Sequence, residues 1–230
     1  METMHALAIE LSAAPCSVAL LRDGAVRVEK KWDRERASSR LFPALSELFK
    51  ESGVAPAEVD QYAVGLGPGS FAGLRMALTA ARAMALPGQR ALFGMGSDHA
   101  LACELLRNHN GDTLAIVGDA RRSRYWLGLF RRTKAGLAER VAPLELLAPA
   151  ELAARLSGCS LVATPHWDKL GAELDRTVPA GAELVARACV PSADAVGRLA
   201  HRIGCRDGAQ GGPLTPFYLH PPPVLRPASP

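Results

Sequence analysis

The chain has 230 residues, a formal net charge of +4 at pH 7, 48% hydrophobic residues and 22% charged residues. This length can bury a substantial core and the composition is that of an average globular chain, which excludes a disordered or low-complexity protein. No run of 18 apolar residues could span a bilayer, and the N-terminus lacks the pattern of a secretory signal, so we expect a cytoplasmic protein without membrane contact. The five cysteines include no C-x-x-C pair, which predicts reduced thiols.

The first third of the chain predicts three strands, a helix, a strand and a second helix. The three strands form a meander, because they are short β-prone runs and Asp23-Gly24 is a strong hairpin turn. The first helix shows apolar residues at helical spacing, and the second follows a glycine-rich junction and ends at Pro87-Gly88. The expected ranges are, in order, 6–11, 16–21, 25–32, 38–52, 61–66 and about 71–86.

The second half predicts the same order more loosely. A short strand and a helix precede it, and two helical stretches close the folded part. The expected strands are 91–93, 113–118, 124–130, 137–142 and 160–164, and the expected helices are 97–107, 149–156, 181–188 and 192–203. The last ten residues contain five prolines, which predicts an extended tail.

An acidic residue ends the first strand of each half: Glu10 in the first and Asp119 in the second. A duplicated βββαβα lobe with an acid at this position is the layout of the actin-like ATPase (RNase H-like) superfold, in the α/β class. We therefore expect an N-terminal actin-like lobe over residues 1–108, a C-terminal lobe over 109–220 and a Pro-rich tail over 221–230.

Residues 64–75 carry a strand through several glycines directly into a helix. Such a junction can present backbone N–H groups to an anion, but it is not a P-loop, because the required lysine is missing. The alternative is that the glycines allow a tight turn and close packing. Both interpretations remain open from the sequence.

Few residues suggest catalysis. The six histidines form no metal-binding pair, and we attribute the spacing of His99 and Cys103 to helix packing. We therefore expect no catalytic residue, no metal and no cofactor. Glu10 and Asp119 could together position a metal-bound nucleotide, which leaves a small-molecule kinase or ATPase as an alternative.

A basic segment over residues 121–134 contains six cations, with Tyr125 and Trp126 among them. Interleaved basic and aromatic side chains can bind RNA through phosphate contacts and base stacking. A stand-alone RNA-binding module is therefore a further alternative, and the other interpretation is a strand edge protected by charge.

Residues 67–75 resemble the Gly-Pro-Gly-Ser-Phe-Thr-Gly-Leu-Arg signature of the TsaB (YeaZ) family, a bacterial subunit of tRNA threonylcarbamoyladenosine biosynthesis. Further matches lie at residues 8–20, at 119–125 and at Pro216-Phe217-Tyr218-Leu219. Three departures are Glu10 in place of Asp, Ala72 in place of Thr, and the lack of a histidine at position 37. The motif-loop residues are Gly67, Pro68, Gly69, Ser70, Phe71, Gly73 and Arg75.

The resemblance implies a non-catalytic scaffold that pairs with a homologous TsaD-like catalytic subunit. That subunit carries the metal and transfers the threonylcarbamoyl group to adenosine of ANN-decoding tRNAs, and a TsaE-like ATPase cycles the complex. The resemblance also allows a tRNA contact within the complex. It further implies that Glu10 and Asp119 are a vestigial nucleotide site. An M22 glycoprotease-like peptidase label attaches to the family by homology, but no residues here fit peptide hydrolysis.

The family also implies a homodimer when the chain is alone and a partner interface on the first two helices. A core role explains part of the apolar stripe on these helices. The expected interface residues are Leu41, Leu45, Leu48, Met76, Ala77, Ala80 and Met84.

Overall fold

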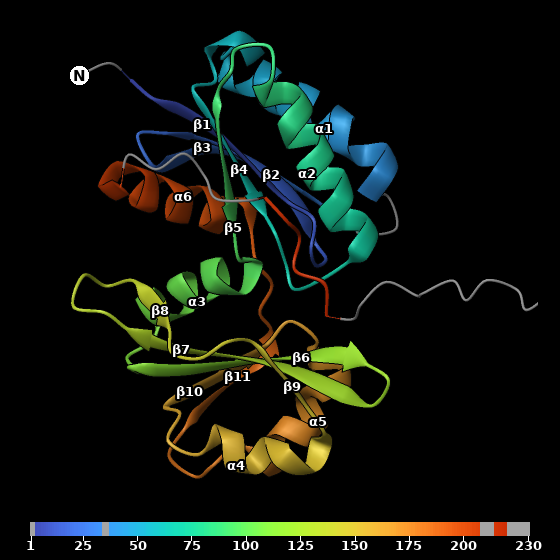
Figure 1. Ribbon diagram of the computed structural model, residues 1–230, viewed down its shortest axis with the longest axis vertical. Coiled ribbons are helices and arrows are strands. Elements are labelled where there is room, and N and C mark those ends of the chain that lie inside the picture. The colour runs from blue at the N-terminus through green and yellow to red at the C-terminus, as the bar shows by residue number, and fades with distance from the viewer. Residues whose placement is uncertain (1–2, 34–36, 208–213, 220–230) are drawn as a thin grey trace, which may run out of the picture.

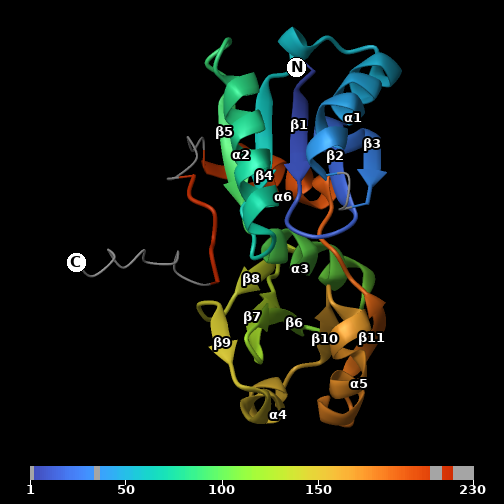
Figure 2. The ribbon, with the colours of Figure 1, turned by 90° about the vertical axis from the view of Figure 1, so that its right-hand side faces the viewer.

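The computed structural model describes residues 3–33, 37–207 and 214–219. The chain forms two α/β lobes, one around a five-stranded sheet and one around a six-stranded sheet (Figures 1 and 2). Both halves contain the predicted order βββαβα, so the expected fold class is confirmed. No helix in the described residues is long and apolar enough to cross a membrane.

The first sheet has the strand order β3-β2-β1-β4-β5. The first three strands form the predicted antiparallel meander, and Asp23 and Gly24 take the positive φ values that its turn requires. Strands β4 and β5 run parallel to β1. The bounds are β1 (His5–Glu10), β2 (Cys16–Arg22), β3 (Ala25–Trp32), β4 (Gln61–Gly65) and β5 (Ala91–Met95).

Helices α1 (Ala37–Ser52) and α2 (Phe71–Ala85) lie side by side on one face of this sheet (Figure 1). Ser70 caps α2, because its side chain accepts a hydrogen bond from the Gly73 N–H. The apolar side of each helix packs on the sheet in one cluster with Leu7, Ile9 and Val64. The helices thus form the main core of the first lobe with one face and expose the other.

The packing of these helices corrects the expected interface residues. Leu41, Leu45, Leu48, Ala77 and Ala80 are at most 5% exposed and belong to the core of the first lobe. They cannot reach a partner, because the face of a helix that covers a sheet is already buried within the chain. Of the seven expected residues the other two, Met76 and Met84, are half-buried at the edge of this core.

The second sheet has the order β11-β10-β6-β7-β8, with β9 paired to β7. Helix α3 covers one face of it, and α4 and α5 pack on the other (Figure 1). The strands are β6 (Thr113–Arg121), β7 (Arg124–Arg132), β8 (Ala138–Arg140), β9 (Glu145–Leu147), β10 (Leu161–Thr164) and β11 (Glu183–Ala188). The helices are α3 (Ser97–Asn108), α4 (Leu152–Leu156) and α5 (Trp167–Thr177).

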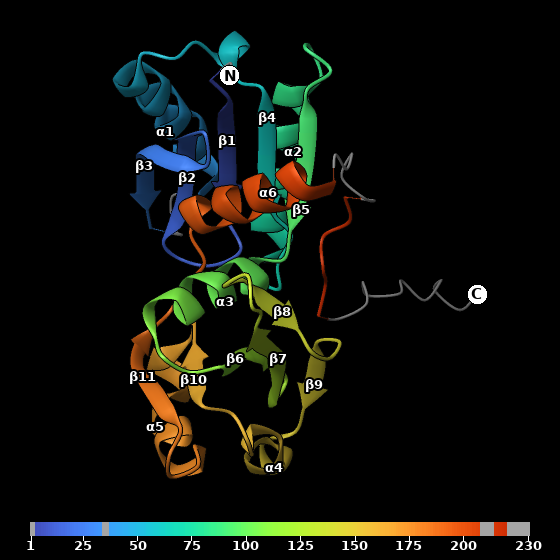
Figure 3. The ribbon, with the colours of Figure 1, turned by 90° about the vertical axis from the view of Figure 1, so that its left-hand side faces the viewer.

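The C-terminal third differs from the expectation in three elements. Residues 183–188 form strand β11 and not a helix, and the sequence analysis missed α5. The last helix, α6 (Ala193–Asp207), packs on the first sheet, on the face opposite α1 and α2 (Figure 3). The first lobe is therefore not contiguous in sequence, because α6 lies within the range expected for the C-terminal lobe.

We predict that two neighbouring alanines of α2 respond oppositely to a charge. Ala80 is 5% exposed in the core, whereas Ala83 is exposed. Ala80→Glu should lower the free energy of unfolding by about 3 kcal/mol or more, because the carboxylate is buried without a partner. Ala83→Glu should change it by less than about 0.5 kcal/mol. Urea denaturation followed by circular dichroism measures both, and equal losses of stability would show that the assignment of the two faces is wrong.

Candidate functional site

The glycine-rich junction between β4 and α2 packs directly on the end of β1. A Cβ added at Gly69 would lie 2.3 Å from the Ser12 carbonyl oxygen, and one at Gly73 would lie 2.1 Å from the Leu11 carbonyl oxygen. The Ser70 N–H donates to the same Ser12 oxygen at 2.8 Å. Two backbone segments can approach this closely only where one of them has no side chain.

Three N–H groups of this junction, those of Gly67, Ser70 and Gly73, form hydrogen bonds within the protein. The Gly67 N–H donates to Ser97 Oγ at 3.0 Å, and the Gly73 N–H donates to Ser70 Oγ at 3.3 Å. With the Ser70 N–H also donated, these groups are not free to hold a phosphate. Of the two interpretations left open by the sequence, the geometry favours close packing over an anion site.

Glu10 is buried beneath the loop. It is fully buried, and its Oε1 accepts a hydrogen bond from the Ser12 N–H at 2.6 Å. Its Oε2 has no hydrogen-bond partner among the described residues and occupies the space above Gly65, where an added Cβ would lie 1.9 Å away. Burial raises the pKa of the Glu10 carboxyl, and hydrogen bonds from Ser12 only partly oppose this.

Asp119 lies in the other lobe and is held there. Its carboxylate accepts hydrogen bonds from Lys169 Nζ at 2.9 Å and from the Arg121 N–H at 2.7 Å. Partial burial raises its pKa, but these two donors outweigh burial, and the pKa lies below the usual value. Glu10 and Asp119 are thus each engaged by residues of their own lobe.

The segment 214–219 contains the C-terminal motif and contacts the motif loop, although the two are far apart in sequence. It runs as an extended strap beside α2 toward the second lobe (Figure 2), where Leu219 packs against the core. The Phe217 N–H donates to the Leu66 carbonyl at 2.7 Å, and Arg82 donates to the Leu214 carbonyl at 2.9 Å. The motif loop therefore binds the C-terminal motif.

At this junction Arg75 stacks on two aromatic rings. Its guanidinium carbon lies 4.0 Å from the centre of the Phe71 ring, and its Nε donates to Tyr218 Oη at 3.1 Å. The Phe71 and Tyr218 ring centres are 4.9 Å apart. Phe71 is 50% exposed and Phe217 is 45% exposed. We call Phe71, Arg75, Phe217 and Tyr218 the Arg75 cluster. The sequence analysis identified both motifs but did not predict that they are in contact.

The outer sides of α1 and α2 carry exposed apolar and small side chains next to the Arg75 cluster. Phe42 is 63% exposed on α1, and Leu86, at the end of α2, is 76% exposed. Along α2 the exposed or half-buried residues at helical spacing are small or flexible. We call the following residues the α1–α2 face: Phe42, Ala72, Met76, Thr79, Ala83 and Leu86.

The basic segment does not form one surface. Arg131 and Arg132 are paired with Glu139 and Asp112 at one end of the nine-residue strand β7. Arg121, Arg122 and Arg124 lie at its other end, roughly 20 Å away. Trp126 is 3% exposed in the core of the second lobe, so it cannot stack on a base. The geometry therefore does not support the alternative of one continuous RNA-binding surface along this segment, and it fits better the interpretation of strand ends protected by charge.

His99 and Cys103 pack as expected for helix residues. The His99 ring hydrogen-bonds the Ala138 carbonyl at 2.8 Å, and the Ala138 N–H lies 3.4 Å from Cys103 Sγ. Within the ranges that the structure describes, no three or more His, Cys, Asp or Glu residues form a group that could hold a metal ion.

Comparison with known proteins agrees with this fold and site. A family model described as TsaD, tRNA N6-adenosine threonylcarbamoyltransferase, matches residues 34–156, just over half of the chain. The tRNA threonylcarbamoyladenosine biosynthesis protein TsaB of Escherichia coli (strain K12) is 27% identical over 134 residues, 58% of each chain. TsaB of Bacillus subtilis (strain 168) is 31% identical over 61% of this chain and 60% of that one. The alignments thus span less than two thirds of these relatives.

Solved structures extend the likeness to nearly the whole chain. YeaZ from Pseudomonas aeruginosa has a TM-score of 0.78 at 26% identity and covers 94% of this chain and 99% of its own. The activator of 2-hydroxyisocaproyl-CoA dehydratase from Clostridium difficile, with bound ADPNP, has a TM-score of 0.51 at 9% identity, which shows the shared fold alone.

The two lobes with their crossing C-terminal helix define an actin-like α/β protein in which the motif loop serves as a packing element. The chain belongs to the TsaB (YeaZ) family of tRNA threonylcarbamoyladenosine biosynthesis proteins. The resemblance read from the motifs is thereby confirmed.

We predict that Glu10→Gln stabilises the chain at neutral pH. Because the pKa of Glu10 is raised in the folded state, the unfolded chain loses its proton near pH 4.5 while the folded chain retains it. The stability of the native chain therefore falls as the pH rises from 4.5 through the raised pKa. The uncharged variant escapes this loss, so its advantage should grow over the same range.

Denaturation in urea at a series of pH values measures this difference. Glu47→Gln is the control, because Glu47 is exposed and forms a surface ion pair with Arg40. It should change stability by less than about 1 kcal/mol at each pH. A Glu10→Gln variant that is less stable than the native chain at pH 7 would contradict the burial of an unpaired charge.

Proposed function

We propose that the chain is a cytoplasmic, non-catalytic subunit in tRNA threonylcarbamoyladenosine synthesis. It pairs with a TsaD-like catalytic subunit, and a TsaE-like ATPase cycles the complex, for threonylcarbamoyl modification of adenosine in ANN-decoding tRNAs. The names of its relatives and the matching family model support this pathway. Because the alignments cover only part of those relatives, the partners and the substrate belong to the proposal.

The observation that carries the proposal is the use of the motif loop for packing. Glycines 69 and 73 seat the loop on the end of β1, and Glu10 is closed beneath it. The most recognisable motif of the chain thus positions the Arg75 cluster and the first turn of α2 at the surface. Three of its N–H groups form hydrogen bonds within the protein. A loop built in this way presents a surface to a partner protein.

The α1–α2 face supplies a suitable partner surface. Small residues along one side of a helix let a second helix approach closely, and methionine adapts to more than one partner shape. The aromatic rings of Phe42 and Phe71 would anchor the edge of such a contact. The same face can serve a second copy of the chain when the catalytic subunit is absent, which accounts for a homodimer of the chain alone.

The kinase or ATPase alternative finds less support, because its two carboxylates are engaged separately. The peptidase alternative has no nucleophile assigned to it. ATP turnover with magnesium by the purified chain, lost on Asp119→Ala, would favour the kinase or ATPase over the scaffold.

We predict that Ala83→Glu disrupts association and leaves the fold intact. A carboxylate at the centre of the α1–α2 face is desolvated without a partner when a second helix covers it. Binding of the TsaD-like subunit from the same cell should weaken by on the order of 100-fold, about 2.7 kcal/mol. Analytical ultracentrifugation with and without that subunit measures both self-association and pairing.

The control is Ala153→Glu, the same change at an exposed position of α4 in the second lobe. It should leave association unchanged. If Ala83→Glu retains full binding while Ala153→Glu loses it, the partner contacts the second lobe, and the assignment of the face is wrong.

A second candidate function is an RNA contact by the β6–β7 turn within the complex. Arg121, Arg122 and Ser123 have φ values of 62°, 51° and 54°, a left-handed conformation that costs about 1 kcal/mol or more per residue. The guanidinium groups of Arg121, Arg122 and Arg124 make no ion pair with the described residues. Exposed cations on a strained turn favour a contact with phosphate groups.

We predict that replacing these three arginines by glutamine lowers tRNA affinity of the assembled complex. Each lost phosphate contact should reduce the slope of log K against log salt by about 0.7–0.9. The control is Arg131→Gln, whose arginine is paired with Glu139. Filter binding at several salt concentrations measures the slopes, and an unchanged slope in the triple variant would exclude the contact.

A further inference from the structure

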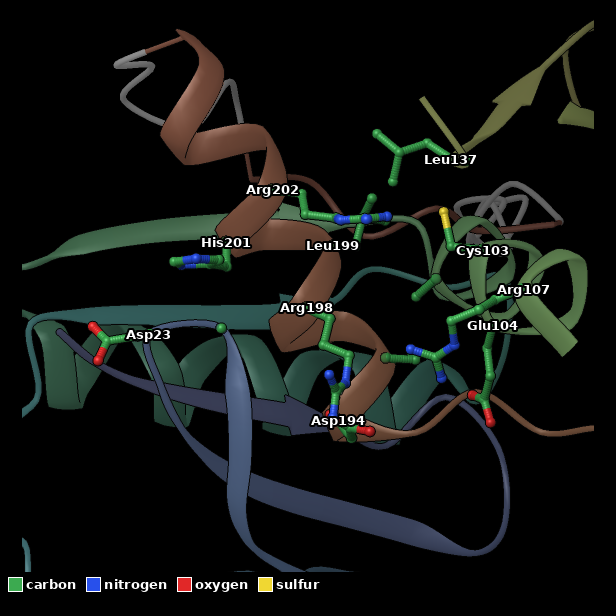
Figure 4. A pocket seen from close by; sticks show the side chains of 14 residues that line it. Asp23, Cys103, Glu104, Arg107, Leu137, Asp194, Arg198, Leu199, His201 and Arg202 are labelled. Atoms are coloured by element: carbon green, nitrogen blue, oxygen red, sulfur yellow. The ribbon is translucent and has the colours of Figure 1, made fainter. Parts of the chain in front are cut away.

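A cavity of about 190 Å³ lies between α3 and α6, the two helices that face each other across the junction of the lobes (Figure 4). Helix α3 packs on the second sheet and α6 packs on the first, so residues of both lobes line it. Ala100, Leu137 and Leu199 give it an apolar wall.

Three guanidinium groups enter this cavity from the two helices. Arg198 is already partnered, because its Nε donates to Asp194 Oδ1 at 2.6 Å. Arg107 on α3 and Arg202 on α6 make no hydrogen bond or ion pair with the described residues. Figure 4 shows Arg202 pointing from α6 toward Cys103, and the positive charges of both Arg107 and Arg202 act on that thiol.

Three acidic residues also line the cavity, and within the described residues none of them forms a hydrogen bond or ion pair with Arg107 or Arg202. Asp23 lies at the far side of the cavity, where it accepts a hydrogen bond from the Met4 N–H at 3.0 Å. Asp194 already accepts the hydrogen bond from Arg198. Glu104 is half-buried, and burial raises the pKa of its carboxyl, which Arg107 opposes and Asp194 reinforces. The N–H groups of the Arg107 and Arg202 guanidinium groups therefore remain available to a ligand in the cavity.

We propose that this cavity binds a compact oxyanion, a phosphate or carboxylate group, held by Arg107 from α3 and Arg202 from α6. Guanidinium groups form charge-assisted, paired hydrogen bonds with both kinds of oxyanion. The volume admits inorganic phosphate or a small organic acid, whereas larger cofactors need cavities of at least ~300 Å³. The apolar wall of Ala100 and Leu199 suits the carbon part of an organic acid.

Such a ligand links the two lobes, because one of its arginines belongs to each. Any ligand that binds only the folded, closed arrangement stabilises it by mass action. Phosphate should therefore raise the melting temperature of the chain as well as bind. This proposal is independent of the proposed function in tRNA modification.

The test is a titration of the full chain with sodium phosphate by isothermal calorimetry, against sodium chloride of equal ionic strength. Succinate serves as a second probe and distinguishes a carboxylate ligand from a phosphate. We expect saturable binding of one of these oxyanions to one site. Arg107→Gln and Arg202→Gln should each weaken it about tenfold. Arg155→Gln, which removes the same charge from an exposed position of α4 on the other face of the second sheet, should not.

Two-dimensional NMR of the native chain keeps the test decisive if a variant fails to fold. The bound oxyanion should shift the amide signals of residues 100–107 and 198–202. Absence of saturable binding, equal binding by the Arg107→Gln and Arg202→Gln variants, or shifts confined to residues 121–124 would overturn the proposal.

Discussion

The structure depends most on one close approach of two backbones, that of the loop before α2 to the residues after β1. Gly69 and Gly73 contact the carbonyl groups of Ser12 and Leu11 at distances that leave no room for a Cβ. This contact sets the start of α2, closes Glu10 inside the lobe and fixes the loop edge that the C-terminal strap binds. The Arg75 cluster and the outer side of α2 are therefore positioned by the packing of Gly69 and Gly73 on the residues that follow β1.

This arrangement explains why the sequence analysis assigned core residues of α1 and α2 to the expected interface. Periodicity identifies the most apolar face of a helix, and in a helix that covers a sheet that face is the core. Leu41 and Leu48 follow this rule and are fully buried. The outer face is marked only by small residues and by a few exposed apolar side chains such as Phe42, a pattern that a single sequence cannot separate from ordinary surface.

Local signals predicted most of the fold. The Asp23-Gly24 turn, the helical spacing of apolar residues in α1 and the glycine-rich junction before α2 predicted these elements of the first lobe nearly residue by residue. The failures are non-local: residues 183–188 became a strand because β10 was available to pair with them, and α6 returned to a sheet formed almost 200 residues earlier. Arg107 and Arg202 likewise line one cavity only through that return.

The α1–α2 face is the central claim of this account, and backbone hydrogen–deuterium exchange tests it most directly. Exchange is measured on the chain at a concentration that keeps it monomeric and again with the TsaD-like subunit in excess. The account predicts slower exchange in residues 37–52 and 71–86 on complex formation, with little change in the six-stranded sheet. Protection confined to the second lobe, with α1 and α2 unchanged, would contradict it.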